Sequence, residues 1–194
     1  KADLFVFGGL DLEAWADPLL EASGNRKLFR GAEGNVDLSC GIALLNAPTG
    51  TLSRSAGDQH AFGNPHYVMD PENLAVMAAT VLEKLKEADP AGASVYQANA
   101  DRFSAELGQK LAAWRLLADR VRGKEVISYH EDFAYLARFA GLKSEVFLEP
   151  KPGIPPTPQQ IKYLEEYIPG HHVGAIVAPT YFPHEAIARL SERT

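Results

Sequence analysis

The chain is organised around the stretch DPAGASVYQANADRFSAELGQKLAAWRLLADRVRG at residues 89–123. It opens on Asp89-Pro90, an aspartate at the cap position followed by a proline at the first helical position, which predicts a helix start. Apolar residues then recur at steps of three or four, as on one face of a helix: Tyr96, Ala100, Phe103, Leu107, Leu111, Trp114, Leu117 and Val121. A helix over 90–122 would be about 50 Å long at 1.5 Å per residue. This length favours a strut between two lobes, and the alternative is two helices broken near Gly92 or Gly108.

Downstream of this stretch, strand and helix patterns alternate. Strands are predicted at 125–129, 144–148 and 173–178, and helices at 131–140, from Thr157 to about Gly170, and at 184–193. Thr157 with Gln160 reads as a capping box, and five prolines between 150 and 158 predict a stiff extended loop. Alternating strands and helices indicate a parallel sheet with helices on both faces.

Upstream of it, Leu4–Phe7 predicts a strand that ends at Gly8-Gly9, and Asp11–Ala22 predicts a helix bent at Pro18. Two weaker extended pieces follow at 27–30 and 36–39, and then a long loop at 46–64. Asp70-Pro71-Glu72 starts a helix that runs to about Ala88. We therefore expect an α/β protein with an N-terminal lobe at 1–89, a linking helix at 90–122 and a C-terminal lobe at 123–194.

Composition excludes several classes of protein. The 19 basic and 25 acidic residues give a net charge of −6, which argues against nucleic-acid binding, since that depends on Lys and Arg neutralising phosphates. No apolar run approaches the roughly 20 residues needed to cross a bilayer. The single cysteine, Cys40, cannot form an internal disulfide, and its apolar setting predicts a buried structural thiol.

Two of the six histidines stand out by position. His66 ends the long loop, and His130 follows the strand at 125–129, where the carboxyl ends of parallel strands place ligands. Two neutral imidazoles from separate lobes would be a natural start to a zinc site. The alternative is a hydrogen-bonded histidine at a strand end and a loop histidine. His60 could be an auxiliary ligand, although a solvated loop histidine is the simpler interpretation.

The other candidates favour ordinary roles. His171-His172 and His184 are expected at the surface. Glu131 could serve as the general base of a zinc hydrolase, but an acid at this place is also explained by a helix N-terminus. The sequence has no His-Glu-x-x-His motif, no Gly-x-Ser-x-Gly elbow and no phosphate-binding or dinucleotide-binding glycine loop.

Several segments, in order and with matching spacings, resemble the zinc/manganese-type substrate-binding proteins of bacterial ABC transporters. They are KADLFVFGGLDLE at 1–13, NPHYVMDPEN at 64–73, ADP at 88–90 with YQANA at 96–100, SYHEDFAYL at 128–136 and EPKPGIPPTP at 149–158. The resemblance implies two parallel-sheet lobes joined by one long rigid helix, with a metal site in the cleft. It implies that His66 and His130 are metal ligands, and His130 favours zinc because manganese prefers harder oxygen donors.

The resemblance also implies a function and a setting. The chain would be the zinc-binding component of an ABC importer, outside the cytoplasmic membrane, delivering the ion to a permease, with no enzymatic activity and as a monomer when complete. The family's first and fourth ligands are expected before Lys1 and beyond Thr194, so we expect a central fragment that binds zinc weakly alone. Ala178-Pro179-Thr180 departs from the family's Glu-containing segment. Alternatives are a zinc hydrolase that uses Glu131, a manganese-binding relative, or an adhesin of the same fold.

Overall fold

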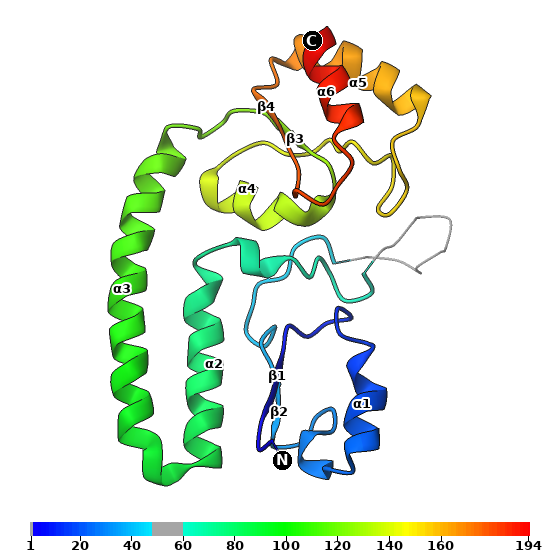
Figure 1. Ribbon diagram of the computed structural model, residues 1–194. Helices are drawn as coiled ribbons and strands as arrows, with labels where there is room; N and C mark the ends of the chain where they lie inside the picture. Colours follow the sequence, from blue (N-terminus) through cyan, green and yellow to red (C-terminus); the bar gives the residue numbers. More distant parts are fainter. Residues whose placement is uncertain (1, 48–59) are drawn as a thin grey trace. The chain divides into compact units, whose positions relative to one another are not determined.

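The structure, a computed structural model, describes residues 2–47 and 60–194 and divides into two compact units (Figure 1). Unit 1 holds the described residues up to Trp114, and unit 2 holds Arg115–Thr194. The division falls within α3 (Ala93–Asp119), so one helix continues from the first unit into the second. The predicted α/β class, with parallel sheets and one long helix, is confirmed. Most of the predicted loop at 46–64 lies outside the described residues.

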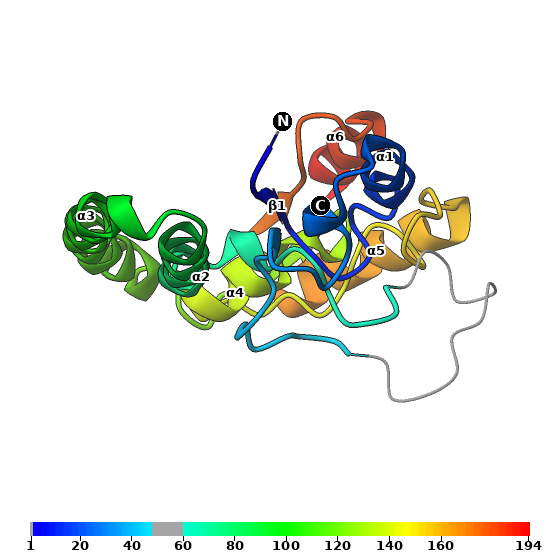
Figure 2. The same ribbon diagram turned by 90° about the horizontal axis from the view of Figure 1, so that it is seen from below.

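Unit 1 is built on a two-stranded parallel sheet of β1 (Phe5–Phe7) and β2 (Asn35–Asp37). Phe5 pairs with Asn35, and Phe7 pairs with Asp37. The helices α1 (Ala16–Ser23) and α2 (Asn73–Ala88) lie on opposite sides of this sheet, with α3 beyond α2 (Figures 1 and 2). Short 3₁₀ turns cover the connections, at η1 (Arg26–Leu28), η3 (Tyr67–Met69) and η4 (Pro90–Gly92).

Three predictions for this unit are wrong. The first helix begins at Ala16 rather than Asp11, so Pro18 stands in its first turn, where a missing backbone N–H costs no helical hydrogen bond. Residues 27–30 are not extended, because η1 tightens the chain before β2. Cys40 is exposed rather than buried, since it lies in the turn at 38–41 that follows β2.

The aspartates predicted to cap both long helices accept backbone hydrogen bonds, but α2 begins at Asn73 rather than Pro71, and α3 begins at Ala93 rather than Pro90. Asp70 Oδ1 accepts a hydrogen bond from the Glu72 backbone N–H at 2.9 Å, just before α2. Asp89 Oδ1 accepts from the Gly92 N–H at 3.3 Å, and Asp89 Oδ2 accepts from the Tyr96 hydroxyl at 2.7 Å. Gly108 lies inside α3, so the helix is not broken there. Its 27 residues span about 40 Å, shorter than the predicted 50 Å.

Unit 2 is built on β3 (Val126–Ser128) and β4 (Ala175–Val177), which are parallel. Its core joins the strands to α5 (Pro158–His171) and α6 (Glu185–Arg193), and its buried members are Ile127, Tyr129, Leu148, Ile161, Leu164, Ile168 and Leu190. α4 (Ala134–Ala140) follows the 3₁₀ turn η5 (Glu131–Phe133) and lies on the other side of the strands in Figure 1.

The strand predicted at 144–148 is replaced by two isolated parallel bridges to the other edge of β3, Glu125 with Lys143 and Ser128 with Phe147. Four steps along the chain from Lys143 to Phe147 oppose three steps from Glu125 to Ser128, so one extra residue interrupts the ladder.

The capping box predicted at the start of α5 is half formed. Thr157 Oγ1 accepts from the Gln160 N–H at 3.1 Å, but the Gln160 amide donates to Phe147 O instead of returning to Thr157.

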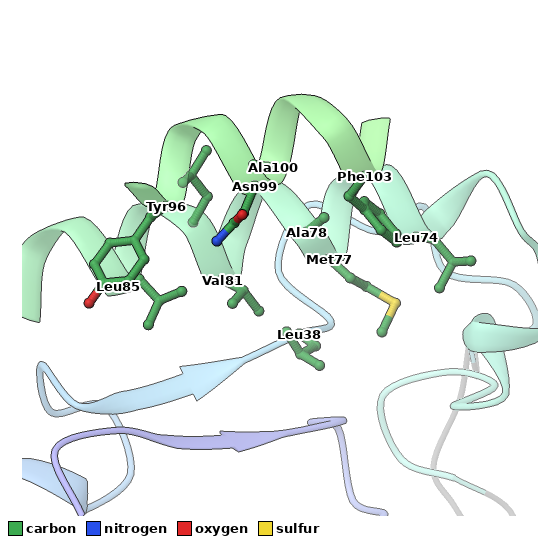
Figure 3. A pocket seen from close by; sticks show the side chains of 11 residues that line it. Leu38, Leu74, Met77, Ala78, Val81, Leu85, Tyr96, Asn99, Ala100 and Phe103 are labelled. Atoms are coloured by element: carbon green, nitrogen blue, oxygen red, sulfur yellow. The ribbon is translucent and has the colours of Figure 1, made fainter. Parts of the chain in front are cut away.

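A groove of about 370 Å³ lies within unit 1, between α2, α3 and the residue that follows β2 (Figure 3). Its lining is apolar apart from Tyr96 and Asn99. Leu38 reaches it from the sheet side, while Met77 and Val81 come from α2. Across the described parts of the chain, no helix combines the length and the apolar character that a membrane crossing requires.

Candidate metal site

His66 is held by a turn that its own neighbours form. The Asn64 backbone N–H donates to Leu45 O at 2.8 Å, and the Asn64 side chain is buried. Asn64 Oδ1 accepts from the His66 backbone N–H at 2.9 Å, two residues on, which is an Asx turn with Pro65 at its centre. The same oxygen lies 2.9 Å from His66 Nδ1. The turn therefore fixes both the backbone and the ring of His66.

The residue after His66 anchors this turn to the rest of unit 1. Tyr67 is fully buried, and its hydroxyl donates to Gly8 O at the end of β1. The Asn73 side-chain amide at the start of α2 donates to Tyr67 O at 2.7 Å. His66 thus lies where the sheet and the N-terminus of α2 meet.

His60 lies beside His66 in the same unit. Their ring centroids are 6.0 Å apart at a steep angle. His60 Nδ1 is 2.7 Å from Asp11 Oδ1, and the Ala61 N–H donates to Asp11 Oδ2 at 3.2 Å. His60 is thus a partly exposed histidine whose ring contacts an aspartate 49 residues earlier in the chain.

His130 follows β3 in unit 2, at the carboxyl end of the strand. The Tyr129 N–H donates to Val177 O at 2.9 Å on one side of the strand, and the Glu149 N–H donates to Tyr129 O at 3.1 Å on the other. Continuing the Ser128–Phe147 register by two residues places Glu149 opposite His130. His130 Nδ1 lies 2.8 Å from Glu149 Oε2, and the Glu149 side chain is only 7% exposed.

Aromatic rings cover the same strand end. Phe182 stacks on Tyr129 with centroids 4.2 Å apart, and its ring lies 6.4 Å from that of His130. Tyr181, next to Phe182, is 79% exposed. The segment Ala178-Pro179-Thr180, which follows β4, therefore leads into an aromatic contact.

Two acids follow His130 in η5. Glu131 is half-buried in its first turn. Asp132 is buried, and neither of its carboxylate oxygens has a hydrogen-bond partner among the residues that the structure describes. Burial raises the pKa of the Asp132 carboxyl, and the nearby His130 opposes that shift.

The other histidines are exposed, as predicted. His171 and His172 end α5, and His184 precedes α6. Within 2–47 and 60–194, no three His, Cys, Asp or Glu side chains are gathered in a geometry that could hold a metal ion. His60 and His66 are neighbours in unit 1, and His130 belongs to unit 2.

Three partners of these histidines were not predicted from the sequence. Asn64 could have been found, because Asn-Pro marks a turn in which the asparagine bonds the backbone two residues on. Glu149 opens the proline-rich segment, but its role depends on a strand register that the sequence leaves open. Nothing in the sequence connects Asp11 to His60.

Comparisons with known proteins agree on one family. The family model described as zinc-uptake complex component A, periplasmic (ZnuA), matches residues 1–194. The iron-binding protein YfeA of Yersinia pestis is 24% identical over 200 residues, covering all of this chain and 58% of that protein. The zinc uptake protein ZnuA of Bacillus subtilis is 25% identical over 195 residues, covering 98% of this chain and 58% of the relative.

A solved structure has the same fold. The structure of a ZnuA deletion mutant (138–173) with zinc bound superimposes with a TM-score of 0.79 at 23% identity, covering all of this chain and 68% of that one. The chain thus spans about 58% of the length of the two curated relatives.

Proposed function

This chain belongs to the family of the periplasmic zinc-uptake complex component A, and on that premise we propose that it is the metal-binding component of a bacterial ABC importer. It would capture a divalent cation outside the cytoplasmic membrane and deliver it to a membrane permease. The observation that carries the proposal is the match of the family model along residues 1–194. The family consists of transport components rather than enzymes, so the hydrolase alternative with Glu131 as base is set aside.

Zinc is the proposed cargo, although the relatives' names are divided between zinc and iron. The donors that we propose in this chain are the imidazoles of His66 and His130, with His60 as an auxiliary. Imidazole suits zinc better than it suits manganese, which prefers carboxylate and water oxygens. In both proposed ligands a side-chain oxygen lies within 3 Å of Nδ1, and Nε2 is the nitrogen proposed to bind the metal.

The test uses the full-length protein. Elemental analysis after purification should find zinc, and calorimetry should show tighter binding of zinc than of manganese or iron. His66→Ala and His130→Ala should each weaken zinc binding by orders of magnitude, while His184→Ala, an exposed histidine, serves as the control. Unchanged zinc affinity in both ligand variants would remove these residues from the site.

The proposed organisation follows the expected boundaries, with lobes at 1–89 and 123–194 and a linking helix at 90–122. In cells, we expect the full-length protein on the outer side of the cytoplasmic membrane, acting as a monomer with its permease. Deleting its gene should slow growth under zinc limitation, and added zinc should restore growth. Normal zinc uptake in the deletion strain would contradict a role in import.

A further inference from the structure

We infer that Asn64 and Glu149 are the positioning residues of the proposed metal site, each holding one histidine in the tautomer that directs Nε2 to the metal. The inference rests on the proposed function, because His66 and His130 are its proposed ligands. A metal-ligating histidine normally donates its other ring N–H to a fixed acceptor, which sets the ring orientation and the basicity of the ligating nitrogen. Both acceptors are identifiable here, and they arise in different ways.

The Asn64 contact determines the tautomer of His66. A backbone N–H can only donate, so the Asn64 atom that faces the His66 N–H at 2.9 Å must be the amide oxygen and not the nitrogen. The same oxygen faces His66 Nδ1 at 2.9 Å. An amide oxygen only accepts, so Nδ1 carries the proton and Nε2 keeps its lone pair for the metal. Because Asn64 is buried and tied to Leu45 O, the acceptor is itself fixed.

The Glu149 contact reaches the same result through strand pairing. Glu149 stands opposite His130 in the parallel register, so its carboxylate lies on the same face of the sheet. Glu149 Oε2 accepts a hydrogen bond from the Gly153 N–H at 3.0 Å. The same carboxylate oxygen lies 2.8 Å from His130 Nδ1 and accepts from it. Gly153 has a φ of +74°, a conformation that suits glycine, and it turns the proline-rich loop back toward the carboxylate.

The two acceptors differ in charge, so we expect their loss to lower the metal affinity by different amounts. Asn64 supplies a neutral oxygen, whereas Glu149 supplies a carboxylate that also strengthens the imidazole as a donor. Loss of a side chain that accepts a hydrogen bond from a metal-ligating histidine typically lowers metal affinity by about 10–100-fold. We expect Glu149→Ala to lie at the upper end of this range and Asn64→Ala at the lower end.

The competing explanation is that both side chains only stabilise their loops. Long-range ¹H–¹⁵N spectra of the metal-free chain at alkaline pH, where imidazole is neutral, separate the two explanations. His66 and His130 should show a protonated Nδ1 and an unprotonated Nε2. Asn64→Ala should change this for His66 only, and Glu149→Ala for His130 only. Asn64→Asp keeps the acceptor oxygen and should restore the wild-type pattern for His66.

Matched variants separate positioning from charge and from folding. Glu149→Gln keeps an oxygen that can accept from both donors, so it should retain the tautomer of His130 while weakening zinc binding less than Glu149→Ala does. Asn35→Ala removes an asparagine of β2 whose side-chain amide donates to Leu28 O in unit 1, and Glu125→Ala removes a glutamate that accepts from the Tyr167 hydroxyl in unit 2. Both controls should leave the tautomers and the zinc affinity of the full-length protein unchanged.

The outcomes distinguish this inference from the proposed function. If His66→Ala and His130→Ala weaken zinc binding but Asn64→Ala and Glu149→Ala do not, the inference is overturned and the function stands. If the full-length protein binds no zinc, the function fails, and the spectra of the metal-free chain still decide whether these residues fix the two rings. Unchanged tautomers in both alanine variants would overturn the inference in either case.

Discussion

Gly9, at the end of β1, occupies a position that has no room for a side chain. Its φ is +79°, and a Cβ placed on it would lie 1.9 Å from Asp37 Oδ1. That oxygen is held in place, because it accepts hydrogen bonds from the Ser39 N–H at 2.8 Å and the Ser39 hydroxyl at 2.6 Å. The chain can pass this close to the Asp37 side chain after β1 only because residue 9 has no Cβ.

Gly9→Ala should therefore destabilise unit 1 more than conformational strain alone explains. Gly24 is the matched control, since its φ is +65° but a Cβ there would meet nothing within 4 Å. Gly24→Ala should lower the free energy of unfolding by about 1–2 kcal/mol, the cost of a left-handed alanine. Denaturant titration should show a larger loss for Gly9→Ala, and equal losses would mean that the Asp37 contact has no effect.

Tyr167 makes the stability of the folded chain depend on pH in the alkaline range. Its hydroxyl donates to Glu125 Oε1, and this bond raises the pKa of Tyr167 to about 12 from 10.0. A raised folded-state pKa contributes stability that is fully present below about pH 10 and is lost as the pH rises through about 12. Tyr167→Phe should therefore reduce the difference in stability between about pH 9 and about pH 12, as followed by thermal unfolding. An unchanged pH profile would contradict the role of this bond.

At the residue scale, the sequence predicts two metal-binding histidines but did not predict the side chains that contact their rings. His66 and His130 stand out in the sequence because one ends a long loop and the other follows a predicted strand, where ligands bind in parallel sheets. Their acceptors depend on geometry, since Glu149 meets His130 only in one register and Asp11 meets His60 only after the chain folds. Whether the two histidines bind metal remains a prediction.

Among the elements, α3 carries a glycine, Gly108, in the middle of its sequence. Gly108 is helical, and a Cβ placed on it would meet nothing within 4 Å. Glycine at such a site costs conformational entropy without providing a close contact in return.

Gly108→Ala should therefore stabilise the chain by about 0.5–1 kcal/mol. The matched control is Gly123, which also has open space but a φ of +77°, so Gly123→Ala should destabilise. Chemical denaturation followed by circular dichroism would measure both changes. A loss of stability in Gly108→Ala would indicate a contact to this face of α3 that the structure does not contain.

Element predictions succeeded where a start or stop signal was present and failed where a tertiary contact decided. Asp70, Asp89 and Thr157 each accept the expected backbone N–H. The strand prediction at 144–148 was wrong because residue types alone cannot reveal an extra residue in the ladder. The Gln160 side chain does not take its predicted capping role, because its amide donates to Phe147 O, a partner distant in sequence.

At the scale of the whole molecule, the chain contains two compact units with separate buried residues. Leu164 is fully buried in the core of unit 2, and Leu20 of α1 is buried in unit 1. The sequence predicted this two-lobed α/β class from the alternation of elements on either side of one long helix.

Leu164→Ala should destabilise unit 2 by about 2–5 kcal/mol, the usual range for a buried leucine. Hydrogen exchange should show faster exchange for amides of β3, β4 and α5, with little change in β1, β2 and α1. Leu20→Ala should produce the reverse pattern. An equal increase across both units in either variant would show that the chain unfolds as one cooperative body.

The unequal count of residues between the two bridges on β3 has a consequence for tolerance to insertion and deletion. Because the extra residue lies between Lys143 and Phe147, removing one residue of 144–146 would leave a regular ladder with both bridges intact. The same edit two positions later has a different effect. Inserting a residue directly after Phe147 would bring Leu148 opposite His130, and deleting Leu148 would bring Pro150 there. Natural variants of this chain should therefore differ in length before Phe147 but not between Phe147 and Glu149.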